Sequence, residues 1–97
     1  MTDRILEHED FAGLVGAEFT VRGAQPPVTL TLIDSQAARQ FAPQFRMPFT
    51  LLFSTRDQRV FAQQTFPLHN AGMGDLDIFL VPIDQTDDGV TYQAVFN

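Results

Sequence analysis

The sequence predicts a mainly β domain: an antiparallel six-stranded meander closed into a small barrel or sandwich, with a short N-terminal helix. Three observations predict it. About six segments either alternate apolar and polar side chains or are almost wholly apolar, as strands do. Their connections are short enough to join antiparallel neighbours. Because a single segment has helical spacing, closing or folding the sheet is the way to bury its apolar face.

Composition predicts one globular domain over residues 1–97, since 44% of the residues are apolar, ten are Phe and no break in composition marks a linker. The net charge is −6, and the six cationic residues are scattered Arg without any Lys. Nucleic-acid binding requires clustered Lys and Arg that neutralise phosphates, so we expect no nucleic-acid partner. With no Cys, the chain offers no disulfide framework and no thiol nucleophile.

The N-terminal segment MTDRILEHED is acidic, without the basic and apolar regions of a signal peptide. No apolar run approaches the 18 residues of a membrane-spanning helix. We therefore expect a cytoplasmic protein without a membrane partner.

Helical spacing is confined to residues near the N-terminus. Phe11, Leu14 and Val15 follow the i, i+3, i+4 pattern, which predicts a short helix from about Glu9 to Val15. Gly16 is placed to end it in a left-handed conformation. The first strand is then expected over Glu18–Arg22, because apolar and polar side chains alternate there.

The clearest alternation in the chain lies in Val28–Ile33, whose valine and leucines are predicted to face inward. Asp34–Phe45 is expected to be one helical turn or an irregular loop, because an Asp-Ser pair that could cap a helix precedes good helix formers. Phe49–Phe53 reads as an apolar strand. A further short strand is expected to begin at Val60, and another at Gln64–His69, whose proline predicts a sheet edge.

A β-hairpin is expected at the C-terminal end. Leu76–Ile83 is apolar on both faces and is therefore predicted to be buried on both, whereas Val90–Phe96 alternates like a half-solvated strand. Between them, Asp87, Asp88 and Gly89 have turn chemistry, with the glycine supplying a positive φ.

The same turn also carries a candidate metal site. Segment Asp84–Gly89 matches the first, third, fifth and sixth positions of an EF-hand calcium loop. The twelfth position, which needs a bidentate Glu, is Val95, and strands flank the loop in place of helices. A weakly held Ca²⁺ on Asp84, Asp87 and Asp88 is one interpretation, and a simple hairpin turn is the other.

No catalytic constellation is visible, so we expect a protein that is not an enzyme and has no cofactor. The two serines, Ser35 and Ser54, do not lie in the sequence context of a nucleophile. If a catalytic centre existed, His69 with Asp75 or Asp77 would form it, acting as a general base and its carboxylate. The alternative is that these two aspartates are polar residues at the exposed start of a strand.

Several segments together resemble one protein family. Ile78–Ile83 (IFLVPI) followed by Tyr92–Asn97 (YQAVFN) resembles the C-terminal FLVPI…YxAVFN signature of a family of short bacterial domains of unknown function. Phe11–Gly16, Pro48–Phe53 and Phe66–His69 resemble the same pattern in the same order. The resemblance implies no activity and no catalytic residue. It implies a loose association with phage-tail-collar-like proteins, and hence an accessory or assembly role.

We therefore expect a protein-interaction or assembly module, with a protein partner or self-association. Its candidate surfaces are the strand that carries Pro67 and the segment Phe41–Phe45, since both combine apolar side chains with residues that disfavour the sheet interior. An equal alternative is that Phe41 and Phe45 plug one end of a barrel. The rival function is a β-barrel that binds a small ligand or Ca²⁺.

Overall fold

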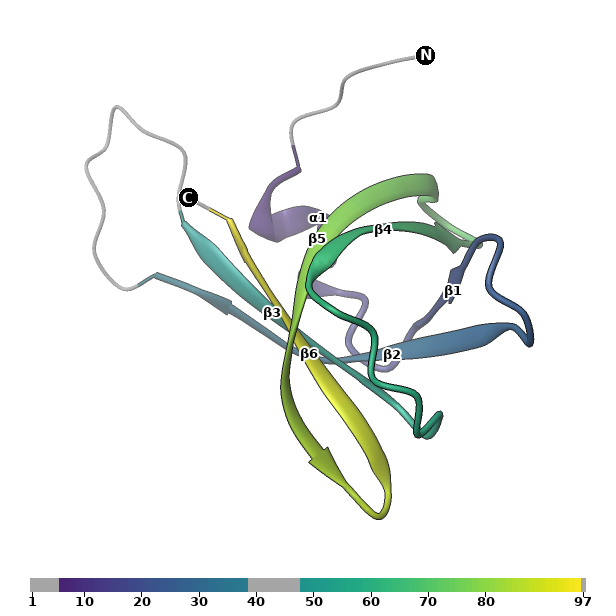
Figure 1. Ribbon diagram of the computed structural model, residues 1–97. Coiled ribbons are helices and arrows are strands. Elements are labelled where there is room, and N and C mark those ends of the chain that lie inside the picture. The colour runs from purple at the N-terminus through teal and green to yellow at the C-terminus, as the bar shows by residue number, and fades with distance from the viewer. Residues whose placement is uncertain (1–5, 39–47, 97) are drawn as a thin grey trace.

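The computed structural model describes residues 6–38 and 48–96. Within these residues, six strands form a closed antiparallel barrel in the order β1-β2-β3-β6-β5-β4 (Figure 1). The elements are α1 (His8–Ala12), β1 (Glu18–Val21), β2 (Val28–Ala37), β3 (Phe49–Thr55), β4 (Gln64–Asn70), β5 (Gly74–Thr86) and β6 (Gly89–Phe96). The expected mainly β fold with a short N-terminal helix is thus confirmed, and of the two closed forms it is the barrel.

The strand order keeps the expected meander within each half of the barrel. Strands β1 to β3 are sequential neighbours, and so are β4 to β6. The meander is interrupted between the halves, where residues 56–63 connect β3 to β4. These two strands are not neighbours, because β6 pairs with β3 and β4 pairs with β1. Sequence periodicity does not report which strands are neighbours, so this order could come only from the tertiary structure.

Helix α1 covers one end of the barrel. It is shorter than the predicted Glu9–Val15, because the chain leaves the helix at Gly13 and turns to Gly16, which has the expected positive φ of 97°. The backbone N–H of Glu7 donates to the Asp10 carboxylate at 2.8 Å and satisfies the start of the helix. Phe11 is fully buried. No helix in the described residues is long and apolar enough to cross a membrane.

The core is the inward face of the six strands together with the helix. Inward positions alternate with outward ones along β2, so its valine and two leucines are buried as predicted. The buried apolar residues are Phe11, Phe19, Val21, Val28, Leu30, Leu32, Phe49, Leu51, Phe53, Phe66, Leu68, Ile78, Leu80, Val90, Tyr92 and Ala94. They belong to one cluster, so side chains fill the barrel interior.

Two expectations for the middle of the chain are wrong. Asp34–Ala37 is neither a helical turn nor a loop, because β2 continues through it and pairs with β3 after a bulge that inserts Ile33. Val60 does not begin a strand: residues 57–62 have no regular structure. The candidate segment Phe41–Phe45 lies outside the described residues.

The expectation that Pro67 marks a sheet edge is also wrong. Strand β4 has β5 on one side and β1 on the other. Proline is tolerated here because the contact with β1 is short: Thr20 pairs with His69 and Val21 with Leu68. Next to them, the Pro67 carbonyl accepts from the backbone N–H of Arg22 at 2.7 Å, so no proline donor is needed.

The C-terminal hairpin is confirmed in its outline. The β5–β6 ladder reaches the pair of Thr86 with Gly89, which leaves a two-residue Asp87-Asp88 turn. Gly89 has the expected positive φ, 138°. Contrary to expectation, β5 is buried on one face only, because the barrel wall is a single sheet with solvent outside.

Candidate functional site

The outward face of β5 carries the most prominent apolar surface of the strand. Phe79 is 52% exposed, Ile83 is 49% exposed and Val81 is half-buried. We call these three residues the β5 outer patch. Alternation places Phe79 and Val81 outside because Ile78 and Leu80 face the core. Ile83 follows them along the strand as the extra residue of a bulge between Pro82 and Asp84, and it is exposed.

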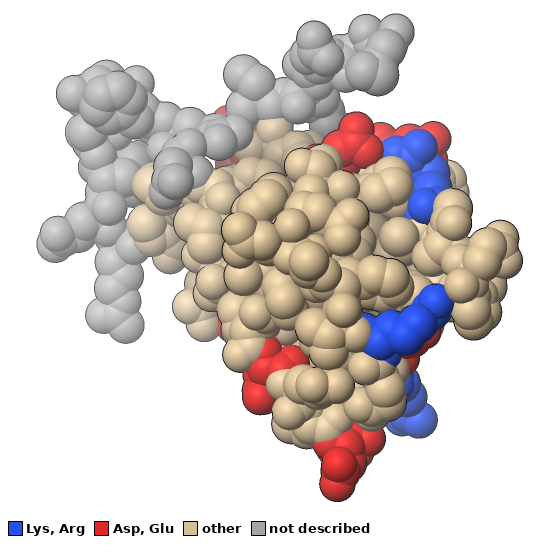
Figure 2. Space-filling view, viewed as in Figure 1, with Lys and Arg blue, Asp and Glu red and all other residues tan. Residues whose placement is uncertain are grey.

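The neighbours of the β5 outer patch across the sheet are uncharged. Phe79 lies opposite Thr65 of β4, and Val81 lies opposite Gln93 of β6. Figure 2 shows the result, a broad surface without charged side chains over the middle of this face, with acidic side chains at the hairpin tip below it. The patch is therefore apolar and uncharged in its centre, and the acidic hairpin tip lies beyond one end of it.

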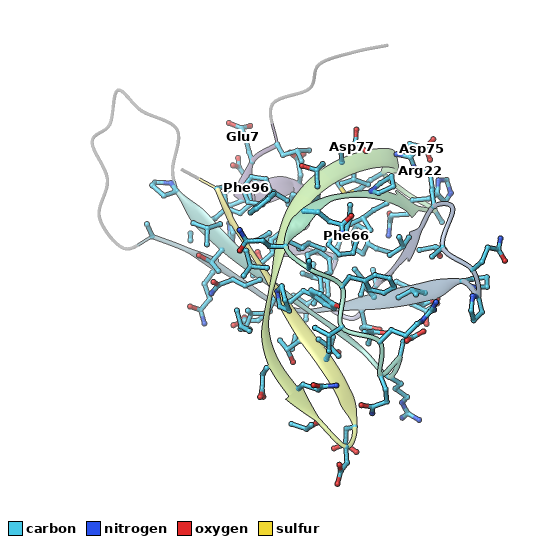
Figure 3. All side chains as sticks on the ribbon, viewed as in Figure 1. Glu7, Arg22, Phe66, Asp75, Asp77 and Phe96 are labelled. Atoms are coloured by element: carbon cyan, nitrogen blue, oxygen red, sulfur yellow. The ribbon has the colours of Figure 1, made fainter. Side chains whose placement is uncertain are left out.

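One end of the patch is a cluster of charged side chains where β4 turns into β5 (Figure 3). His69 and Asp75 lie opposite each other in the ladder, with Nδ1 and Oδ1 2.7 Å apart. Arg22 Nη2 donates to Asp77 Oδ1 at 3.0 Å, and Arg22 Nη1 lies 3.9 Å from Asp75 Oδ2. Arg22 Nε also donates to the Leu68 carbonyl at 3.3 Å. The cluster thus joins the residue that follows β1 to β4 and β5.

This cluster contains the pair that sequence analysis named as the only conceivable catalytic centre. The structure brings His69 to Asp75, whereas Asp77 is bound by Arg22. The His69 hydrogen bond, and then the Arg22 charge, hold the pKa of Asp75 below its usual range. All four side chains are between 41% and 66% exposed, so this is a solvated ion cluster on the barrel surface.

The other end of the patch is the acidic hairpin tip. Asp84 lies within the ladder opposite Thr91, and Asp87 and Asp88 form the turn, so no long loop exists to wrap an ion. Across the described parts of the chain, no group of three or more His, Asp or Glu side chains is arranged to hold a metal. All three aspartates are exposed, and within residues 6–38 and 48–96 none forms an ion pair. The calcium site stays a prediction.

A second surface feature is an open groove of about 710 Å³ over β2 and β3. The residues that line it include Thr29, Thr31 and Ser54, together with Arg56 and Asp88. It is wide and polar, and it lies outside the barrel, whose interior is filled by the buried apolar cluster.

The wall of this groove is held by an ion pair that sequence analysis missed. Arg59 Nη2 donates to Asp57 Oδ2 at 2.7 Å, and this bonding lowers the pKa of Asp57 to about 2. The same guanidinium donates to the carbonyls of Gln25 and Pro26 at 3.0 and 2.8 Å. Arg59 therefore ties residues 56–63 to the β1–β2 connection. Sequence spacing gave no signal for the bonds from Arg59 to the carbonyls of Gln25 and Pro26, which are distant in the chain.

Comparison with known proteins places the chain in a family. No curated protein and no solved structure matches it. A family described as a domain of unknown function (DUF6916) matches residues 6–96. The resemblance to short domains of unknown function is thereby confirmed, while the C-terminal signature and the phage-tail association stay predictions. Because the match spans nearly the whole sequence, the chain belongs to this DUF6916 family.

Proposed function

We propose that the protein is a non-enzymatic interaction module that docks a protein partner on the β5 outer patch. The observation that supports this is the exposure of Phe79 and Ile83 within five residues of one strand, beside half-buried Val81. Single exposed apolar residues are common on any protein, but contiguous ones beside uncharged neighbours are typical of contact surfaces.

The physical reason is the free energy of covering apolar surface. Each Å² removed from water contributes about 25 cal/mol, so a partner that covers an aromatic ring and an isoleucine gains binding energy without rearranging the barrel. Strand β5 pairs with β4 over Gly74–Leu80 and with β6 over Val81–Thr86, so the backbone under the patch belongs to the barrel wall. A preformed surface loses little conformational entropy on binding.

Capture of host proteins on the immobilised protein tests the proposal. Phe79→Ser is expected to remove the specifically retained host proteins, because it deletes the largest apolar side chain of the patch. Val15→Ser is the matched control, since Val15 is 54% exposed but lies between α1 and β1. Proteins retained by the wild type and by Val15→Ser but lost with Phe79→Ser are the expected result. Equal retention by all three, with unchanged circular dichroism, contradicts the proposal.

The narrower form of the proposal is an assembly or accessory role in a phage-tail-like structure. Its support is the resemblance to domains associated with phage-tail-collar-like proteins. If it is correct, the protein retained through Phe79 is a tail or collar component, which mass spectrometry of the retained fraction identifies. Retention of unrelated proteins through Phe79 would leave the docking face in place and remove the phage context.

Calcium binding at the hairpin tip is the rival function with a definite site. The short turn supports no wrapped ion, so we expect millimolar Ca²⁺ to leave the melting temperature and the amide signals of Asp84, Asp87 and Asp88 unchanged. Saturable shifts of these signals, absent in an Asp84→Asn variant, would restore the calcium interpretation.

A further inference from the structure

We infer that the partner of the β5 outer patch is a protein segment that carries apolar side chains next to a cluster of Lys or Arg, with the basic end at the hairpin tip. This inference rests on the proposed docking function and adds the chemistry and orientation of the partner. Its basis is the difference between the charges at the two ends of the patch.

The two ends of the patch both carry aspartates, but their charges are balanced differently. At the β4–β5 turn, Asp75 and Asp77 lie within 4 Å of the Arg22 guanidinium, and Asp75 also bonds to His69. At the hairpin tip, Asp84 and Asp87 have no cationic side chain within ion-pair distance among residues 6–38 and 48–96. An approaching cation therefore gains most at the tip.

The geometry joins this negative charge directly to the apolar surface. Asp84 follows Ile83 in the chain, so one continuous stretch of β5 runs from the ring of Phe79 to an exposed carboxylate. Arg56 lines the groove over β2 and β3 together with Asp88, and it forms no ion pair with Asp84 or Asp87 among the described residues. A partner on β5 thus meets apolar side chains first and unbalanced acid at the hairpin end.

A second copy of this chain fits the surface poorly. The exposed apolar area of the patch is on the order of a few hundred Å², well below the roughly 800 Å² per partner of a stable interface. Each copy also has a net charge of −6, so two tips brought together would repel. Charge complementarity favours a basic partner, because opposite potentials accelerate encounter and fix the register of the contact.

Two synthetic peptides test the inference against ¹⁵N-labelled full-length protein. One has three lysines at one end and three leucines at the other, and its match has glutamates in place of the lysines. We expect the lysine peptide to shift the amide signals of Phe79 and Ile83 and to bind about tenfold more tightly than the glutamate peptide at low salt. A spin label on its lysine end should broaden the signals of Asp84 and Asp87.

Three variants separate the possible outcomes. The triple variant Asp84→Asn, Asp87→Asn, Asp88→Asn should abolish the preference for the lysine peptide, and Asn at the two turn positions should preserve the hairpin because Asn and Asp both favour turns. Glu9→Gln, which removes an exposed charge on α1, should keep the preference. Phe79→Ser should weaken the binding of both peptides.

Each alternative result has a distinct meaning. If the two peptides bind equally tightly and both lose binding in Phe79→Ser, the inference of a basic partner is overturned while the docking face remains supported. If each peptide shifts the amide signals equally in the wild type and in Phe79→Ser, the docking face itself is overturned. A concentration-dependent dimer that requires Phe79 overturns the basic partner in favour of self-association.

Discussion

The barrel is closed at two contacts between its halves, and they are built differently. The β3–β6 contact has seven register pairs, from Phe49 with Phe96 to Thr55 with Val90. The β1–β4 contact has two register pairs, supplemented by side chains. At the first contact, the rings of Phe49 and Phe96 stack with their centroids 4.4 Å apart. At the second, Arg22 and Asn70 reach across to the neighbouring strands.

Closure of this small barrel therefore does not require a long hydrogen-bonded ladder between every pair of neighbouring strands. Strand β1 has four residues because turns with positive φ at Gly16 and Gly23 bound it, so it cannot match the seven residues of β4. Hydrogen bonds from the buried Asn70 side chain and the partly exposed Arg22 side chain supplement the short ladder. We therefore expect the β3–β6 contact to depend on backbone fit and the β1–β4 contact to depend on individual side chains.

The largest effect is expected from Gly89→Ala at the β3–β6 contact. A Cβ at Gly89 would collide with the carbonyl oxygen of Thr55, which is backbone and cannot move aside. Together with the positive φ, this clash should lower the free energy of unfolding by about 3 kcal/mol or more, measured by urea denaturation.

A matched control separates the clash from the backbone strain. Gly23 also has a positive φ, 81°, but nothing lies within 4 Å of a Cβ built there. Gly23→Ala should therefore cost about 1 kcal/mol. Equal losses in the two variants would show that the close approach of β6 to Thr55 does not contribute.

An intermediate effect is expected from Asn70→Ala at the β1–β4 contact. The Asn70 side chain is buried, donates to the Glu18 carbonyl at 3.0 Å, and accepts from the N–H groups of Gly72 and Met73 at 2.9 Å. Its loss leaves these groups unpaired and should lower the free energy of unfolding by about 2 kcal/mol. The exposed Gln63→Ala should change it by less than about 0.5 kcal/mol. An Asn70→Ala variant as stable as Gln63→Ala would contradict this account.

The smallest effect is expected from Arg22→Gln, which removes the charge that joins β1 to β5. Because Arg22, Asp75 and Asp77 are between 41% and 66% exposed, solvent screens the ion pairs, and the loss should be about 0.5 kcal/mol at low salt. High salt should reduce the difference from the wild type, since it screens exposed charges. A salt-independent loss would instead indicate that the Arg22 bond to the Leu68 carbonyl matters more.

Much of the fold was predictable because its signals are local. The alternation of Val28–Ile33 marked an inward face, and the Asp-Asp-Gly turn predicted both the hairpin and the positive φ of Gly89. The predictions that failed depend on neighbours in space. Asp34–Ala37 has helix-capping chemistry but pairs with β3, and Pro67 lies in a strand with a neighbour on both sides.

The candidate site was predictable only in part. Both faces of Leu76–Ile83 are apolar in the sequence, but which face meets solvent depends on the direction in which the barrel closes. His69 and Asp75 were named together, yet their partner Arg22 is more than 40 residues away in the chain. Contacts between residues so far apart in the chain produce no periodic pattern in a single sequence.

Local sequence was enough to specify a small, acidic, aromatic-rich chain whose alternating segments form strands, because periodicity and turn chemistry act over a few residues. The tertiary structure alone decided the strand order, the exposed position of Phe79 and Ile83, and the unequal charge balance at the two ends of the β5 outer patch. These properties arise when segments distant in the chain are brought together. The hydrophobic effect favours covering an apolar face, but it is non-directional and does not select which segment covers it.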